Sequence, residues 1–326
     1  MAAALIIVGC LTGCSRQSIL STRSKPAHDI ALLWWWMLGA ATVVFLGAVA
    51  MLVIGWRRRD RPGLPFFGER EDLAQGMVLV FGVVVPLVAL VALFGVSDVY
   101  LVGETGPPNP RSTRMTVNVI GHQWWWEVRY NGTRAITANE IHIPANTRVN
   151  VVATSADVIH SFWVPALNRK IDMIPGMRNR VLLYASKPGI YRGQCSQFCG
   201  LQHAHMSLKV FAQRPAAFRA WLSHEEQPAA SPSGGDAAAG RNLFMNAQCA
   251  SCHTIAGTPA QGTVGPDLTH VASRTSLASD EIPNNAKWLA AWIHNPQKIK
   301  PGTRMPDLGL SSSQIADVVA YLQQLK

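Results

Sequence analysis

Two long, uninterrupted apolar runs mark the first hundred residues of the chain. Residues 31–56 and 74–96 each exceed the ~20 residues that an α-helix needs to cross the hydrocarbon core of a bilayer. The loop between them carries the arginines Arg57, Arg58, Arg59, Arg61 and Arg70, and the next basic residue after the second run is Arg111. Because basic residues mark the cytoplasmic side, the pattern predicts two transmembrane helices with both chain ends outside.

A shorter apolar run precedes these two and ends in small residues beside two cysteines. It is too short to span a membrane, so it predicts a signal peptide over residues 1–14. The tetrad Leu11-Thr12-Gly13-Cys14 resembles a bacterial lipobox, in which Cys14 would be acylated; Cys10 ends a weaker match. An ordinary signal peptide, whose cysteines have no role, is the alternative. We therefore place residues 15–112 in an N-terminal segment that crosses a bacterial cytoplasmic membrane twice.

The pattern changes from helical to extended after about Arg114. "RMTVNVI", "EIHIPANTRVNVVATS" and "MSLKVFAQ" are short, rich in β-branched residues, partly alternating and separated by Gly, Pro and Asn. Residues 113–215 are thus predicted to form a β-sandwich or Greek-key barrel outside the membrane. The low-complexity stretch that follows predicts a flexible, extended linker over 216–235. Helical spacing and a Ser cap in "SSSQIADVVAYLQQLK" predict a small all-α domain over 236–326.

Charge and cysteine content narrow the function. Charged residues are only 15% of the chain, below the ~25% of soluble domains, which agrees with a membrane protein. The net charge of +10 is concentrated in 113–215, which holds twelve Lys and Arg but four Asp and Glu. No nucleic-acid recognition motif accompanies these charges, so we expect no nucleic-acid partner. The six cysteines form three close pairs, and such pairs more often carry metal, haem or redox chemistry than a disulfide framework.

One cysteine pair lies in the C-terminal domain as Cys249-Ala-Ser-Cys252-His253, which is the attachment motif of a c-type haem. Both cysteines would bind one haem covalently, and His253 would coordinate its iron. Electron carriers usually have methionine as the second axial ligand, and Met305 in a Pro-rich loop is the candidate. Met245 is too close to the haem motif to reach the opposite face. A chance thioredoxin-like or zinc pair is the alternative, although "VGPDL" and the terminal helix resemble class I cytochromes c.

The second pair lies in "GQCSQFCGLQHAHM", where Cys195, Cys199, His203 and Met206 are closely spaced. His160 follows a predicted strand and could join them. A disulfide is possible outside the cell, and zinc could take the two cysteines and two histidines but would leave Met206 unexplained. Two thiolates, two imidazoles and a thioether suit copper. A mononuclear blue-copper centre needs one cysteine, whereas two could bridge a pair of copper ions.

Four motifs together resemble subunit II of the haem–copper cytochrome c oxidases: "GHQWWWEVRY", "DVIHSFWVP", "DMIPG" and "CSQFCGLQHAHM". With the haem domain, the chain resembles the caa3-type subunit over nearly its full length. The resemblance implies a cupredoxin-like domain with a binuclear CuA centre, whose ligands would be His160, Cys195, the Gln197 backbone carbonyl, Cys199, His203 and Met206. It also implies that Trp124 accepts electrons for the copper site, while Trp125 and Trp126 pack beneath it. His205 matches no ligand position.

The resemblance further implies an electron-accepting subunit of a proton-translocating terminal oxidase, located on the periplasmic face. Electrons would pass from a cytochrome c or another donor through haem c and CuA to subunit I, which reduces oxygen. Subunit III and a respiratory supercomplex are further expected partners. A copper assembly factor would lack the haem and tryptophan motifs, and nitrous oxide reductase would need a β-propeller that 326 residues cannot hold beside these segments.

Overall fold

The computed structural model describes residues 17–58, 71–98 and 105–326. Cys10 and Cys14 lie outside these ranges, so the predicted signal peptide and lipid site remain predictions. The chain divides into two compact units, and each is described by itself. His28–Gly106 forms one, and the N-terminal residues with Pro107–Lys326 form the other.

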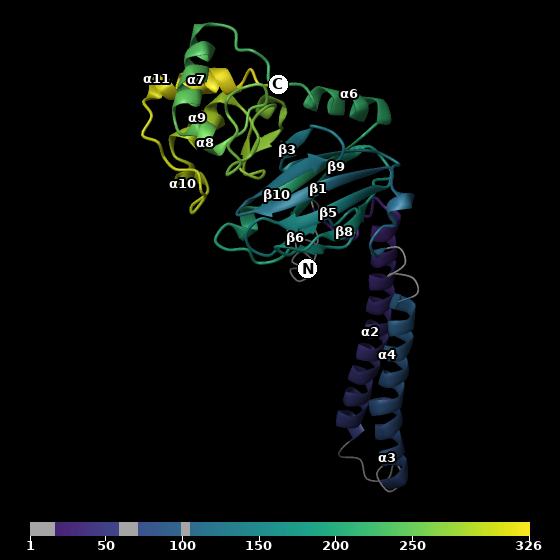
Figure 1. Ribbon diagram of the computed structural model, residues 1–326. Coiled ribbons are helices and arrows are strands. Elements are labelled where there is room, and N and C mark those ends of the chain that lie inside the picture. The colour runs from purple at the N-terminus through teal and green to yellow at the C-terminus, as the bar shows by residue number, and fades with distance from the viewer. Residues whose placement is uncertain (1–16, 59–70, 99–104) are drawn as a thin grey trace, which may run out of the picture. The chain divides into compact units, whose positions relative to one another are not determined.

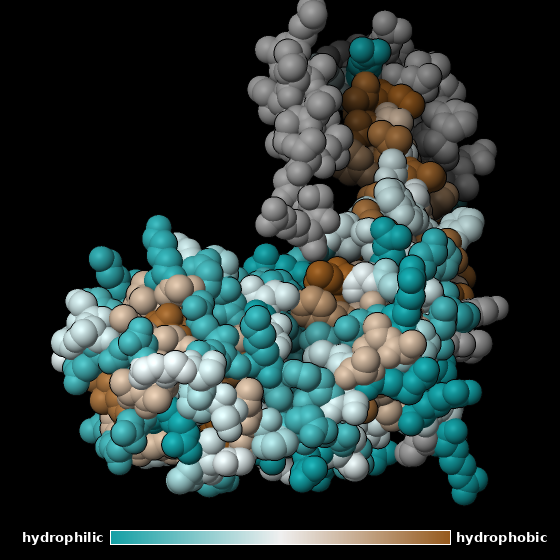
Figure 2. All heavy atoms as spheres, turned by 90° about the horizontal axis from the view of Figure 1, so that it is seen from above, coloured by the Kyte–Doolittle hydropathy of each residue, from teal (hydrophilic) through white to brown (hydrophobic). Residues whose placement is uncertain are grey.

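The first unit consists of helices that are long and apolar enough to cross a membrane, over Lys25–Arg57 and Gln75–Val96. Figure 2 shows apolar side chains gathered over them. Helix α2 (Lys25–Arg58) begins six residues before the predicted apolar run. The Ser24 hydroxyl accepts a hydrogen bond from the Ala27 amide, and Pro26 suits a first turn, so a polar turn precedes the membrane-spanning part.

The second membrane helix changes its geometry ahead of Pro86. It runs as α3 (Glu71–Leu79), a π-helical turn η1 (Val80–Val84) and α4 (Val85–Val96). A proline inside a helix removes one backbone hydrogen bond and its ring crowds the carbonyl four residues earlier. A widened turn placed just before Pro86 relieves this crowding, so the helix continues through the proline.

Residues 115–213 form a β-sandwich of two five-stranded sheets, as the alternating pattern predicts (Figure 1). One sheet has the order β3 (Ile136–Ala138), β2 (Trp125–Tyr130), β1 (Met115–His122), β5 (Val149–Ser155), β8 (Asn179–Leu183). The other has the order β4 (Glu140–Pro144), β10 (Ser207–Gln213), β9 (Gly189–Cys195), β6 (His160–Trp163), β7 (Ile171–Met173). The pairs β1–β5 and β4–β10 are parallel and the others are antiparallel. Buried residues from both inner faces, including Val119, Trp126 and Ile141, fill the space between the sheets.

The predicted linker over 216–235 is too long, because a helix occupies its first half. Helix α6 (Pro215–Glu225) carries Phe218 and Trp221 at helical spacing, and the Trp221 ring stacks on His142 with centroids 4.0 Å apart. The rest of the predicted linker, residues 226–235, is hydrogen-bonded to the C-terminal domain. The Ala229 amide donates to the Ala256 carbonyl at 3.0 Å, and the Ser233 amide donates to the Gln324 side chain at 2.7 Å.

The C-terminal domain is helical with one small hairpin. Its elements are α7 (Gly235–Asn246), α8 (Cys249–Cys252), the 3-10 helix η5 (Val271–Ser273), β11 (Ser276–Leu277), β12 (Ile282–Pro283), α9 (Ala286–His294), α10 (Pro296–Ile299) and α11 (Ser312–Leu322). Helix α11 begins at the predicted Ser cap, where Ser311 and Gln314 form a capping box. The β11–β12 hairpin was not predicted. Its turn has three consecutive residues at positive φ, Ala278, Ser279 and Asp280, which no sequence pattern marked.

Candidate metal centres

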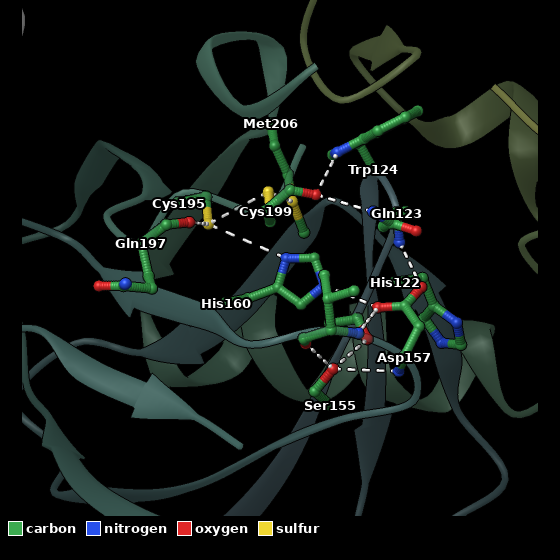
Figure 3. Close-up of polar contacts among 12 residues, drawn as sticks. His122, Gln123, Trp124, Ser155, Asp157, His160, Cys195, Gln197, Cys199 and Met206 are labelled. Carbon is green, nitrogen blue, oxygen red and sulfur yellow. Dashed lines mark hydrogen bonds and ion pairs between the residues drawn. The ribbon is translucent and has the colours of Figure 1, made fainter. Parts of the chain in front are cut away.

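The copper candidate is built at one end of the second sheet, where three segments meet (Figure 3). Strand β9 ends at Cys195, and the chain returns to β10 through a loop that contains the 3-10 helix η4 (His203–His205). The Cys195 amide donates to the Met206 carbonyl at 2.9 Å, which closes this loop. Strand β6 begins with His160 and pairs with β9, so the histidine reaches the same end of the sheet. We call the segment 196–206 the copper loop.

All six predicted donors meet around the two free thiols. Cys195 Sγ and Cys199 Sγ are 3.8 Å apart. Cys195 Sγ lies 3.9 Å from His160 Nδ1 and 3.2 Å from the Gln197 carbonyl oxygen. Cys199 Sγ lies 3.7 Å from His203 Nδ1 and 3.8 Å from Met206 Sδ. Each of the two central sulfur atoms thus has one imidazole and one weaker donor beside it, and such a set of soft donors suits a soft metal ion.

The pKa values of the two cysteines bear on whether the site can bind a cation. The hydrogen bond between the Cys195 and Cys199 sulfur atoms lowers the pKa of Cys195 and raises that of Cys199, while burial raises both. The lowered pKa favours the thiolate form of Cys195. A thiolate, not a thiol, is the form that binds metals.

Asp157 supports the centre from behind His160. Its carboxylate accepts from His160 Nε2 at 2.9 Å, which leaves Nδ1 facing the sulfur atoms. Such carboxylate–histidine pairs fix the orientation of a ligating ring. Burial alone would raise the pKa of Asp157, but bonds from His160 and from the amides of Gln123 and Val158 lower it to about 2.

The haem candidate is a cavity of about 180 Å³ that residues of the C-terminal domain line together with residues of the β-sandwich, among them Trp124. Cys249, Cys252, His253 and Met305 all line it, together with apolar residues such as Leu289 and Ile293. His253 Nδ1 donates to the Pro266 carbonyl at 2.8 Å, so Nε2 keeps the lone pair that a metal needs. Burial lowers the pKa of His253, which keeps the ring neutral.

Arg274 is a further wall residue of this cavity that the sequence did not reveal. Its side chain is buried, and its Nε has no hydrogen-bond partner among the described residues. Buried guanidinium groups usually pair with carboxylates. A haem brings two carboxylates, so an unpaired donor inside the cavity fits that group.

The three tryptophans of "HQWWWE" have different surroundings. The Trp124 indole Nε1 donates to the Cys199 carbonyl at 3.0 Å, and the same side chain lines the haem cavity. Trp126 is fully buried near His160, with ring centroids 6.2 Å apart, as a residue packed beneath the copper site should be. Trp125 differs from the expectation, because it stacks on His122 at 4.2 Å and lines the haem cavity.

Two family descriptions match separate parts of the chain: "Cytochrome C oxidase subunit II, periplasmic domain" over 134–212 and "Cytochrome c" over 237–326. The cytochrome c oxidase subunit 2 of Alkalihalophilus pseudofirmus is 34% identical over 97% of this chain and 94% of that protein. The chain belongs to the cytochrome c oxidase subunit II family. The subunit 2 of Bacillus subtilis is 27% identical over the same shares. The solved periplasmic domain of subunit II from Bradyrhizobium japonicum is 31% identical, covers 36% of this chain and 95% of that chain, and has a TM-score of 0.34.

This membership confirms the resemblance to subunit II of the cytochrome c oxidases and the predicted fold class. This subunit II has apolar helices near its N-terminus, a cupredoxin-like β-sandwich and a fused cytochrome c domain, as in the caa3 type. It is a subunit of a cytochrome c oxidase, a membrane protein with a periplasmic domain that acts in electron transfer.

Proposed function

We propose that this chain is the electron-accepting subunit of a proton-translocating oxidase in a bacterial cytoplasmic membrane. It takes electrons from a cytochrome c donor and delivers them to the haem–copper subunit I, where oxygen is reduced to water. Its two redox groups are one covalent haem c and a binuclear CuA centre, which supply one-electron chemistry when bound. Subunit III is a further membrane partner.

The donor set supports the copper assignment. Zinc would be satisfied by two cysteines and two histidines in a closed tetrahedral site. The observed set adds Met206 Sδ and the Gln197 carbonyl, one beside each sulfur atom. Two cysteine sulfur atoms with four further donors beside them suit two copper ions. The residues that would hold them are His160, Cys195, Gln197, Cys199, His203 and Met206.

The C-terminal domain supports the haem assignment. Cys249 and Cys252 would form thioethers with the porphyrin, and His253 Nε2 and Met305 would bind its iron. The unpaired Arg274 Nε would donate to a carboxylate of the same group. Apolar side chains around them exclude water, which keeps the site dry for electron transfer.

The observation that carries the proposal is the double contact of Trp124. Its indole lines the haem cavity and donates to the carbonyl of Cys199, a proposed copper ligand. One aromatic side chain thus connects the two redox sites by a cavity wall and a hydrogen bond. We assign Trp124 the role of carrying electrons between them.

A shortened chain tests the role of the fused domain. Truncation after Pro228 keeps helix α6 and the whole β-sandwich but removes the haem domain. The shortened oxidase should still show the mixed-valence copper spectrum, yet lose most of its oxidation of the natural donor. Stopped-flow absorbance measures how fast the natural donor is oxidised. If the rate equals that of the intact enzyme, the donor binds directly to the β-sandwich, which we call the copper domain, and the proposal fails.

A further inference from the structure

Lys300 is a buried lysine to which the proposed electron path assigns no role. It directly follows the short helix α10, and its side chain is only 2% exposed. The ammonium donates to the backbone carbonyls of Trp124 at 2.8 Å, His205 at 2.8 Å and Ala278 at 2.9 Å. A lysine has three N–H donors, so all of them are used.

The three acceptors come from three segments of two domains. Trp124 lies in the turn between β1 and β2, and His205 lies in the copper loop. Ala278 lies in the β11–β12 turn, which belongs to the cytochrome c domain. Lys300 belongs to the same domain. An ammonium away from water carries a large free-energy cost unless it is fully hydrogen-bonded. Because two of the acceptors belong to the copper domain, burial of Lys300 makes physical sense only when the two domains are docked.

The carbonyl of Trp124 receives a second donor from the cytochrome c domain. Ser279 Oγ, also in the β11–β12 turn, donates to it at 2.7 Å. At its other end, the Trp124 indole donates to Cys199 of the copper loop at 3.0 Å (Figure 3). The residue is therefore fixed at its backbone by one domain and at its ring by the other.

Two glycines leave room for the indole ring of Trp124. Gly200 in the copper loop has φ +111°, and a Cβ built on it would lie 3.1 Å from the ring. Gly302, two residues after Lys300, has φ +82°, and its Cβ would lie 3.5 Å from the ring. One glycine comes from each domain, so both backbones approach the same tryptophan closely.

Opposite charges surround this contact. Asp280 forms ion pairs with Lys209 at 2.5 Å and with Arg192 at 3.6 Å, and Glu281 pairs with His205 at 2.9 Å. The acids belong to the β11–β12 turn and the basic residues to the copper domain. Each partly exposed pair contributes little to stability, but together the pairs fix the orientation and register of the contact. Part of the positive charge of the β-sandwich is thus matched within the same chain.

We propose that Lys300 is a positioning residue for electron transfer, whose ammonium holds the cytochrome c domain in one docked position on the copper domain. In that position Trp124 stays in contact with both redox sites. The fused domain then acts as a fixed component, and electron transfer needs no prior docking step. This inference rests on the proposed function, because the docked position matters for turnover only if electrons pass between the two sites.

The test compares Lys300→Met with Lys298→Met in the complete, copper- and haem-loaded oxidase. Methionine is unbranched and only one atom shorter than lysine, but it removes all three donors; Lys298 is exposed on α10, two residues before Lys300. Amide hydrogen exchange is measured for residues 122–126 and 276–281. Loss of charge-assisted bonds should speed exchange in both segments by at least about tenfold in Lys300→Met. Lys298→Met should match wild type.

A second readout separates docking from general damage. The haem-to-copper transfer rate of wild type should not depend on solvent viscosity, since no domain movement precedes it. In Lys300→Met the rate should fall as viscosity rises, while copper and haem contents stay unchanged. Ser279→Ala, which removes one donor to the same carbonyl, should give a smaller effect in the same direction and serves if Lys300→Met does not assemble.

Two outcomes overturn different claims. If the variants at Lys300 and Ser279 keep wild-type exchange and viscosity-independent transfer, Lys300 does not position the domains, although the proposed function stands. If the segments respond as expected but wild type shows no transfer between haem and copper, the docking contact stands and the proposed function fails.

Discussion

The copper loop and the haem cavity differ in how their donor atoms are arranged before any group is bound. Around the copper loop, the donor atoms already converge, and Cys195 and Cys199 are only 3.8 Å apart. In the cytochrome c domain, the donors line a cavity of about 180 Å³ whose walls are mostly apolar but include the buried Arg274. A pair of ions fills little volume, so its site can form from side chains alone. A macrocycle fills the centre of a small domain, and the domain is built around it.

This comparison makes haem attachment the strongest perturbation. Replacing both cysteines, Cys249→Ser with Cys252→Ser, should abolish covalent haem and leave the cavity without its apolar filling. By linkage, loss of a tightly bound group should cost the domain more than about 4 kcal/mol of unfolding free energy. Haem staining after denaturation and thermal unfolding of the domain measure both effects. Ser251→Ala, at the exposed position between the cysteines, is the matched control.

The mixed-valence copper signal should survive in that double variant, because the copper donors lie on the β-sandwich. Electron paramagnetic resonance gives the answer. A signal lost together with the haem would show that the two sites do not load independently, and the comparison would fail.

The converse change is Cys199→Ser, which should leave the haem band intact. The substitution removes one of the two cysteines proposed to hold the copper ions, so the mixed-valence spectrum should disappear. Mutations outside the ligand set commonly cost 10–100-fold, so loss of a proposed thiolate ligand should lower oxidase turnover by more than about 100-fold. Phe198→Leu changes an exposed side chain in the same loop and should keep both. An unchanged copper spectrum in Cys199→Ser would refute the binuclear assignment.

Met305→Ala tests whether the cavity holds its haem at two axial positions. Covalent attachment should persist, but the reduction potential should fall by on the order of 100 mV, since methionine ligation raises it. Carbon monoxide should then bind the reduced iron. Met245→Ala alters a methionine of α7 that lies beside the haem motif, and it should change neither property. If Met305→Ala behaves like wild type, another residue supplies the sixth ligand.

Most of the proposed copper donors lie close together in the sequence, so the sequence alone could suggest that they meet. Five of the six proposed donors lie between Cys195 and Met206, where the β9–β10 pairing brings the ends of the loop together. Only His160 comes from a distant strand, and its motif marked it. The haem motif is equally local. Helix α6 could have been found from the spacing of Phe218 and Trp221, but the low-complexity stretch after it obscured the boundary.

The contacts between the domains could not be predicted in this way. Lys300 stands in "KIKPG", a segment that indicates an exposed, charged turn, and its acceptors are up to 176 positions away. Ser279 contacts Trp124 from the β11–β12 turn, in which three consecutive residues have positive φ. None of the three is a glycine or an asparagine, so the sequence does not indicate this conformation. Tertiary packing decides such positions, and a single sequence does not record it.

The smallest expected effect concerns Glu140, a second residue that joins the domains. Its carboxylate is 3% exposed and accepts from the Thr275 amide at 2.7 Å and from the Thr275 hydroxyl at 2.5 Å. Burial alone would raise the pKa of Glu140, but bonds from His142 and Thr275 lower it below its ordinary value of 4.5.

A carboxyl with a lowered pKa contributes stability that is fully present above the ordinary value and is lost as the pH falls through the lowered one. Exchange of the Thr275 amide, corrected for its intrinsic rate, should therefore accelerate in wild type as the pH falls below the ordinary value of 4.5. Glu140→Gln keeps an oxygen acceptor but loses the charge, so it should cost about 1 kcal/mol at neutral pH, and exchange should change little on acidification. Asp172→Asn alters an exposed carboxylate of the same domain and should follow wild type. Equal protection of Thr275 in Glu140→Gln and wild type at pH 7 would show that this carboxylate does not hold the two domains together.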